Sequence, residues 1–166
     1  MKYSLLADSY EKIEATTKRL EMTDHLVELL KKTPKDLLDK VVYLTQGRLY
    51  PDYVDIEIGI AEKLAIRAVS KATGRSEKEI KEDLKITGDL GETAQKFLEK
   101  KIQTTFFQQL LTVQSVYESL DKMAKASGSG SMDQKINLLA GLLTNATPKE
   151  AKYIIRTATG SLRLGI

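Results

Sequence analysis

The sequence of 166 residues contains no cysteine and no tryptophan, and it has only one histidine, His25, and three prolines. The absence of cysteine excludes a disulfide framework, a thiolate zinc site and catalysis by a cysteine nucleophile. A single histidine excludes a metal site built from several histidines. The longest apolar run, residues 138–143, is too short to cross a bilayer, and Asp8 comes too early for a signal peptide. We therefore expect a soluble, cytoplasmic protein.

The composition is that of one globular domain, with 42% hydrophobic and 30% charged residues. The net charge of +3 is unevenly distributed along the chain. Residues 1–96 carry 17 basic and 18 acidic side chains, whereas residues 97–166 carry 9 basic and 5 acidic ones. This basic C-terminal part is either an ordinary solvated surface or a surface for an anionic partner.

Apolar residues recur at helical spacing almost throughout, which predicts an all-α domain of about ten short helices. One stripe runs from Tyr3 to Leu20 and predicts a long first helix, with a second helix after Thr23. Spacing from Ile56 to Ala68 indicates a helix that ends at Gly74. The one exception is the alternation of Val54, Ile56, Ile58 and Ile60, so a strand at residues 53–58 stays open as an alternative.

Several polar residues precede helical segments in patterns typical of helix N-termini. Thr33 stands before a proline in the expected first helical position, and the helix after it is expected to bury Leu37, Leu38, Val41 and Val42. Capping boxes are predicted for the pairs Ser76 and Glu79, Ser131 and Gln134, and Thr147 and Glu150.

Two glycine-containing turns are candidates for close approach to another backbone. Ser127-Gly128-Ser129-Gly130-Ser131 leads into a predicted helix, with Lys135 one turn further on. Free amides, hydroxyls and an ammonium could bind a phosphate there; the same composition is typical of a flexible linker. Gly88-Asp89-Leu90-Gly91 is a second such turn, and spacing alone favours a plain helix connection with Leu90 packed inward.

The last residues of the sequence place two arginines, Arg156 and Arg163, around Gly160. Their guanidinium groups could bind phosphates as forks or neutralise a helix C-terminus. Farther upstream, Phe106 and Phe107 are adjacent in a polar setting close to Gln103. An exposed aromatic pair could anchor a protein partner, whereas internal packing in two directions is equally consistent with the sequence.

Catalysis by this chain alone is not expected. There is no nucleophile with a histidine nearby in the sequence, and no Gly-x-x-x-x-Gly-Lys phosphate loop. Most carboxylates lie near lysines at helical spacing, where ion pairs account for them.

The ordered series of motifs resembles the N-terminal DNA-binding domain of ATP-dependent DNA ligases of the archaeal and eukaryotic type. The resemblance rests on the turns at residues 88–91 and 127–131, on the segments 134–143 and 151–156, and on the ending Gly160-Ser161-Leu162-Arg163-Leu164-Gly165-Ile166. It covers essentially the whole chain.

The resemblance implies that residues 1–166 form an all-helical domain that binds the minor groove of duplex DNA across a nick. Residues 161–166 would begin the connection to a nucleotidyltransferase domain, which an OB-fold domain follows. It also implies that the parent enzyme uses ATP and Mg²⁺ to seal nicks in replication, repair and recombination, and that it is nucleoid-associated. This sequence has no Lys-x-Asp-Gly adenylation motif, so we expect no cofactor and no ligation for this chain alone.

The DNA contacts implied by the resemblance are Gly88, Asp89, Gly91, Ser127, Gly128, Ser129, Gly130, Ser131, Lys135, Arg156, Gly160 and Arg163. Ser161 stands where the family commonly has a basic residue, so no cationic contact is expected at that position. Gln103, Phe106 and Phe107 resemble a docking motif for the sliding clamp (PCNA), although the usual motif spaces its aromatics farther from the glutamine. The alternative function is therefore a helical adaptor that docks a sliding clamp.

Overall fold

The computed structural model of the chain describes residues 1–101 and 109–166, and its fold is all-α. These two ranges contain no strand, only an isolated antiparallel bridge of Lys2 with Thr112. Nine α-helices and one 3₁₀ helix are found in these two ranges, which agrees with the prediction of about ten short helices. In chain order they are α1 (Tyr3–Glu14), α2 (Arg19–Lys32), η1 (Lys35–Leu37), α3 (Leu38–Thr45), α4 (Glu62–Thr73), α5 (Glu77–Thr87), α6 (Leu90–Glu99), α7 (Val113–Lys125), α8 (Ser131–Asn145) and α9 (Pro148–Ala158).

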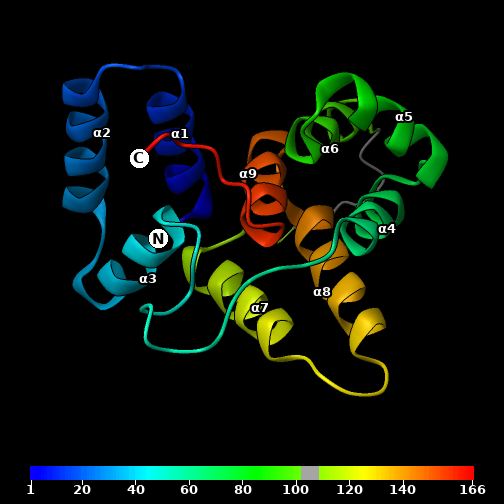
Figure 1. Cartoon of the computed structure of the whole chain (residues 1–166). Coiled ribbons are helices and arrows are strands. Elements are labelled where there is room, and N and C mark those ends of the chain that lie inside the picture. The colour runs from blue at the N-terminus through cyan, green and yellow to red at the C-terminus, as the bar shows by residue number, and fades with distance from the viewer. Residues whose placement is uncertain (102–108) are drawn as a thin grey trace.

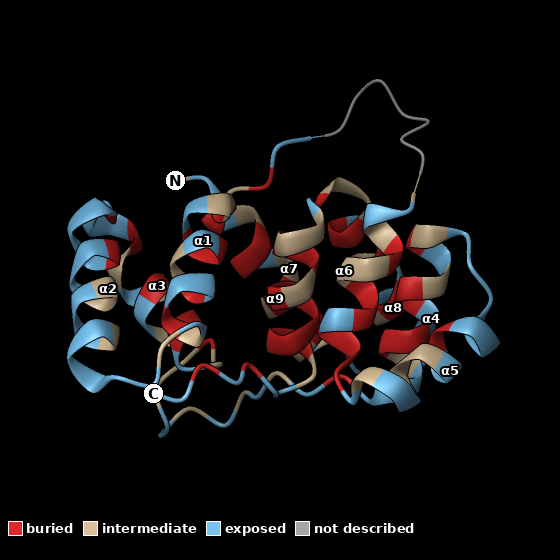
Figure 2. Ribbon diagram, turned by 90° about the horizontal axis from the view of Figure 1, so that it is seen from above, coloured by how far each residue is buried: buried red, intermediate tan, exposed pale blue. Residues whose placement is uncertain are grey.

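Helix α9 lies in the middle of the molecule, packed between α1 and α6 (Figure 1). Helix α2 forms one edge beyond α1, and α4, α5 and α6 gather on the other side, where α4 packs on α8. Figure 2 shows that buried residues concentrate along α9, whereas α2 and α5 turn exposed faces outward. The basic C-terminal part of the sequence therefore supplies this central helix, together with α7 and α8 along the lower side in Figure 1.

The apolar stripe of α1 forms one wall of the core. Tyr3, Leu6, Tyr10 and Ile13 are each at most 2% exposed, and burying a large apolar side chain contributes roughly 1.5–3 kcal/mol. The rings of Tyr10 and Tyr153 meet edge to face with their centroids 5.5 Å apart. The Tyr10 hydroxyl shares a hydrogen bond of 3.1 Å with Thr45. This contact network ties α1 to α9 and α3.

The prediction of one long first helix is wrong beyond Glu14. The chain breaks between α1 and α2, and α2 begins at Arg19, not after Thr23. Thr16 supplies the local cause, because its hydroxyl accepts the Lys18 amide and donates to the Glu21 carboxylate, in competition with helical hydrogen bonds. Leu20, the last member of the predicted stripe, is 81% exposed.

The expected cap at Thr33 is also wrong. The Thr33 hydroxyl donates backward to the Leu29 carbonyl at the end of α2, and Pro34 precedes a 3₁₀ turn rather than occupying the first position of an α-helix. Leu37 and Val41 are buried as expected, but Leu38 is only half-buried and Val42 is 38% exposed.

An extended segment replaces the expected helix or strand before α4. Residues 55–60 have no regular secondary structure, and α4 begins only at Glu62, so Ile56 and Ile60 precede the helix. The Ile60 amide donates to the Ala158 carbonyl at the end of α9 with an N–O distance of 2.9 Å. β-Branched residues favour extended backbone, and this segment reaches the end of α9 through Ile60 with no partner strand among the residues that the structure describes.

Of the three predicted capping boxes, the one at Thr147 is complete: Thr147 accepts the Glu150 amide, and Glu150 accepts the Thr147 amide. Ser76 caps α5 by accepting the Glu79 amide at 3.2 Å. The box at Ser131 does not form, because Gly130 is the residue that precedes α8 and its backbone is left-handed. A box that the sequence analysis missed is formed by Thr112 and Ser115 at the start of α7.

Candidate nucleic-acid interface

The turn at residues 88–91, hereafter the 88–91 turn, joins α5 to α6. Gly88 ends α5 with a φ of 68°, a backbone conformation that favours glycine, and it is exposed. Asp89 is the N-cap of α6 and accepts the Gly91 amide at 2.9 Å. Leu90 packs inward with 7% exposure. The turn thus presents an exposed backbone at Gly88 next to the buried residue Asp89.

Gly91 is buried where α6 crosses α9 most tightly. A Cβ atom at this position would lie 2.7 Å from the Lys152 carbonyl oxygen and 2.8 Å from Cγ of Arg156. Only a glycine permits this approach, because the backbone of α9 occupies the space of a side chain. Gly91 therefore serves helix packing and is not open to a ligand.

Arg156 was predicted as a DNA contact, and the structure places it inside the fold with 2% exposure. Its Nε and Nη2 atoms donate to Oδ2 of Asp89 at 3.0 and 2.5 Å, and its Nη1 donates to Oε2 of Glu14 at 2.9 Å. The guanidinium is thus engaged by carboxylates from two other elements and does not present a fork to a phosphate.

The charges around Arg156 stabilise both carboxylates in their ionised form. Burial alone would raise the pKa of Asp89, but hydrogen bonds from Arg156 and the Gly91 amide and the nearby arginine charges lower it below its usual value. Glu14 behaves in the same way: hydrogen bonds from Arg156 and Tyr153 outweigh burial and lower its pKa. The cluster is therefore an ionised network at neutral pH.

The last residues of the chain lie across the domain beside this network. Leu162 and Leu164 are buried, and the intervening Arg163 is exposed, with a φ of 58°. Nη2 of Arg163 donates to the Gly88 carbonyl at 3.1 Å. Gly160 and Ser161 are exposed where α9 ends. The structure thereby brings Gly88, Asp89, Arg156 and Arg163 into one cluster.

The second predicted turn, residues 127–131, hereafter the 127–131 turn, joins α7 to α8. Ser127, Gly128, Ser129 and Gly130 are exposed, and both glycines have left-handed backbones, with φ values of 81° and 79°. Helix α8 starts at Ser131 without a side-chain cap. The Ser131 amide donates to the Gly128 carbonyl at 3.3 Å, and the amides of Met132 and Asp133 are left as donors for an external acceptor.

Lys135 lies one turn along α8 and is half-buried. No ion pair joins it to any residue of the two described ranges, whereas Lys149 is paired with Asp8 and Glu11. In Figure 1 the 127–131 turn lies at the lower edge of the molecule, well separated from α5 and α6. The two glycine turns are thus distinct surface points, and only an extended ligand could contact both.

Two exposed apolar side chains lie next to these turns and were missed by the sequence analysis. Ile86 is 82% exposed two residues before Gly88, and Met132 is 60% exposed directly after Ser131. Ile86 gave a signal in principle, since it is off the spacing of Ile80 and Leu84, whereas Met132 continues the spacing of Ile136 and Leu139 and gave none. The pairing of Asp89 with Arg156 had no signal, because 67 residues separate the two in the sequence.

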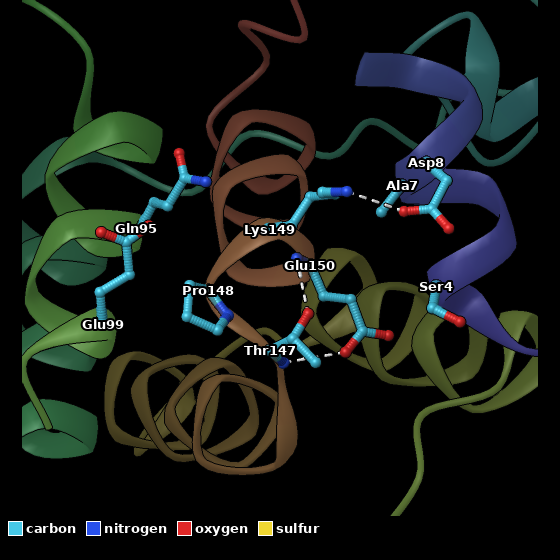
Figure 3. Close-up of a pocket in the computed structure, with 9 residues that line it drawn as sticks. All are labelled: Ser4, Ala7, Asp8, Gln95, Glu99, Thr147, Pro148, Lys149 and Glu150. Atoms are coloured by element: carbon cyan, nitrogen blue, oxygen red, sulfur yellow. Dashed lines mark hydrogen bonds and ion pairs between the residues drawn. The ribbon is translucent and has the colours of Figure 1, made fainter. Parts of the chain in front are cut away.

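A pocket of about 410 Å³ lies at the other end of α9, between α1 and α6 (Figure 3). Asp8, Glu99 and Glu150 line it, and Lys149 donates to Asp8 across its rim at 3.0 Å. Its acidic lining does not suit a phosphate.

Within residues 1–101 and 109–166 no group of three or more acidic, histidine or cysteine side chains is arranged to hold a metal ion. None of the helices described is long and apolar enough to span a bilayer. Gln103, Phe106 and Phe107, the predicted sliding-clamp motif, lie outside the described residues.

Comparison with known proteins gives a consistent result. The family model described as DNA ligase N terminus matches residues 2–166. A DNA ligase of Nitrosopumilus maritimus is 51% identical over 166 residues, and a DNA ligase 2 of Thermofilum pendens is 53% identical over 171 residues. A DNA ligase of Sulfolobus acidocaldarius is 47% identical over 174 residues. These alignments cover 99–100% of this chain but only 28–29% of each relative.

Proposed function

The chain belongs to the DNA ligase N-terminus family, and on that premise we propose that it binds nicked duplex DNA through the minor groove without reading base sequence. The observation that carries the proposal is the pair of separate, exposed glycine turns, each with a basic side chain beside it: Arg163 at the 88–91 turn and Lys135 at the 127–131 turn. A duplex is an extended ligand that could contact two such points together.

The groups at these turns suit sugar and phosphate better than base edges. Exposed glycines allow close approach of the DNA backbone, open amides at the start of α8 can donate to phosphate oxygens, and lysine and arginine supply charge. Ile86 and Met132 add apolar surface of the kind that minor-groove proteins place against DNA. The minor groove offers only a degenerate code, so binding of this kind is independent of sequence.

The predicted contact residues divide accordingly into two groups. The contacts to DNA come from Gly88, Gly160, Arg163, Ser127, Gly128, Ser129, Gly130, Ser131 and Lys135, which are exposed or half-buried. Asp89, Gly91 and Arg156 are buried: Asp89 and Gly91 belong to the 88–91 turn itself, and Arg156 binds the Asp89 carboxylate.

In a longer protein this domain would hold the DNA while other domains carry out the chemistry. The chain spans less than a third of the relatives' length, and those relatives are named DNA ligases. We propose that a nucleotidyltransferase domain and an OB-fold domain of the parent supply adenylation with ATP and Mg²⁺. The parent would then seal nicks in replication, repair and recombination.

Docking of a sliding clamp is a second proposed function, supported by the sequence motif of Gln103, Phe106 and Phe107. It predicts clamp binding that the double change Phe106→Ala and Phe107→Ala abolishes, with DNA affinity unchanged. Surface plasmon resonance against the clamp tests it, and retained binding by the double variant would exclude this motif.

Fluorescence anisotropy with a labelled nicked duplex at low salt tests DNA binding. Lys135→Glu should weaken binding about tenfold or more, since it replaces an attraction to phosphate with a repulsion. Lys32→Glu is the matched control: Lys32 is exposed at the end of α2, the helix at the edge beyond α1, and this variant should lose only the small effect of net charge. Absence of binding by the wild type, or equal losses in both variants, would contradict the proposed interface.

A further inference from the structure

We propose that Arg156 is a positioning residue for the DNA-binding surface: it holds and neutralises the buried carboxylate of Asp89, and thereby fixes the 88–91 turn, without touching DNA. The inference rests on the proposed function and explains how one of its two contact points is shaped.

The hydrogen bonds of Asp89 divide between the backbone and the guanidinium. Oδ1 accepts the Gly91 amide at 2.9 Å, and Oδ2 accepts Nε and Nη2 of Arg156 at 3.0 and 2.5 Å. Because both oxygens are engaged, the carboxylate cannot rotate without breaking one of the two sets. The orientation of Arg156 is thus transmitted to the Gly91 amide, the second of α6, and to the turn around it.

Arg156 is itself fixed by its surroundings. Its guanidinium is held on another side by Glu14 of α1 at 2.9 Å, and it lies over the ring of Tyr153 at 5.5 Å from the centroid. Its Cγ lies beside Gly91, where a Cβ would come within 2.8 Å. Since Arg156 is 2% exposed, it can act on the turn only from below.

Charge gives Arg156 a second effect at the same place. Asp89 follows Gly88 in the chain, and the Gly88 carbonyl accepts the exposed Arg163, so an unpaired negative charge at Asp89 would oppose the approach of a phosphate. With Arg156 present, the anion is compensated within the fold. Loss of Arg156 would therefore both release the turn and place an uncompensated carboxylate beneath the proposed contact surface.

The test compares Arg156→Gln with Lys96→Gln in the 166-residue protein. Lys96 also donates from α6 to a carboxylate, that of Asp83 on α5 at 2.6 Å, but it does not contact the turn. Both changes remove a cation from a carboxylate. We expect Arg156→Gln to weaken binding to a nicked duplex about tenfold, and Lys96→Gln to leave it within twofold, with anisotropy as the measurement and circular dichroism to record each Tm.

Two further measurements separate positioning from general stability. Amide hydrogen exchange at Gly91 should accelerate in Arg156→Gln but not in Lys96→Gln. Arg156→Lys, which keeps the charge and loses the fork, should recover part of the affinity. If Arg156→Gln does not fold, the double variant Arg156→Gln with Asp89→Asn carries the test, because it removes the uncompensated anion. The double variant should fold where Arg156→Gln alone does not. In any condition where both fold, the double variant should bind DNA more tightly than Arg156→Gln.

The results that would overturn the inference are distinct from those that would overturn DNA binding. Wild-type DNA affinity in folded Arg156→Gln would show that Arg156 does not position the surface. The same conclusion would follow if both glutamine variants lost DNA affinity in proportion to their decrease in Tm. If the wild type itself fails to bind DNA, the proposed function fails, while Gly91 exchange still decides whether Arg156 fixes the turn.

Discussion

Gly91 is the residue at which the fold leaves no room for a side chain. Replacement by alanine would place a methyl group against the Lys152 carbonyl and the Arg156 stem, and the backbone oxygen cannot move without shifting α9. We expect Gly91→Ala to lower the free energy of unfolding by about 1–3 kcal/mol, measured by urea denaturation.

Gly141 provides the control for that substitution. It is exposed and lies within α8, away from both ends, and a Cβ there would meet nothing within 4 Å. Gly141→Ala should therefore stabilise the protein by about 0.5–1 kcal/mol, through the conformational entropy that glycine loses in a helix. Equal effects of the two changes would show that the α6–α9 contact does not restrict position 91.

The network around Arg156 predicts how stability depends on pH. The pKa values of Asp89 and Glu14 are lowered in the folded protein, so the unfolded chain binds these protons more tightly. Their stabilising contribution is complete above the unfolded pKa values, near pH 4 to 5, and is lost as pH falls through the lower folded values. Urea midpoints from pH 7 to pH 3 should fall at the acid end.

The variant Asp89→Asn tests whether this network causes the loss of stability at acid pH. The amide oxygen can still accept the Gly91 hydrogen bond, but the residue no longer titrates, so the stability of the variant should fall less steeply below pH 4 than that of the wild type. If the stability of Asp89→Asn falls with pH as steeply as that of the wild type, other carboxylates cause the loss of stability in acid.

At the scale of the element, two serine or threonine positions with the same sequence pattern behave differently. Thr147→Ala should cost about 1 kcal/mol of stability, because Thr147 accepts the Glu150 amide in a complete capping box. Ser131→Ala should change stability little, because Gly130 precedes α8 and no side chain caps it. Thermal unfolding of both variants measures the difference, and a comparable loss for Ser131→Ala would show that it caps α8 in solution.

The sequence predicts helices better than it predicts their ends. Helical spacing indicates α4, which ends at Gly74 as expected but begins only at Glu62, and Gly88 ends α5 within the predicted turn. The break after Glu14 is not visible as a loss of periodicity, because the stripe continues by chance to Leu20. It depends on the Thr16 hydroxyl and on α2 folding back against α1, which is a tertiary event.

At the scale of the whole molecule, DNA binding should depend steeply on salt. If about four phosphates are neutralised, the logarithm of the binding constant should fall with the logarithm of salt concentration with a slope of about −3.6. Anisotropy titrations between low and moderate salt measure it, and Lys135→Glu should reduce the magnitude of the slope by about one. A slope near zero would be incompatible with contacts to the DNA backbone.

The candidate site was predictable in its parts and not in its arrangement. Small residues and basic side chains identify the two turns and the C-terminal segment, because that chemistry is local. Whether an arginine faces solvent is not local: Arg156 and Arg163 are seven residues apart, yet one is buried in an ion-pair network and the other is exposed. The difference arises from Asp89 and Glu14, which the fold brings to Arg156 from distant parts of the chain.

The anchoring of Leu162 and Leu164 determines where the polypeptide leaves the domain. These two side chains direct the last residues away from the end of α9 toward α2, where Gly165 lies close to Met22. A fluorescent reporter fused after Ile166 would consequently emerge beside α2, at a defined distance from a dye attached to that helix. Energy transfer between the two would reveal any detachment of this tail on encountering DNA.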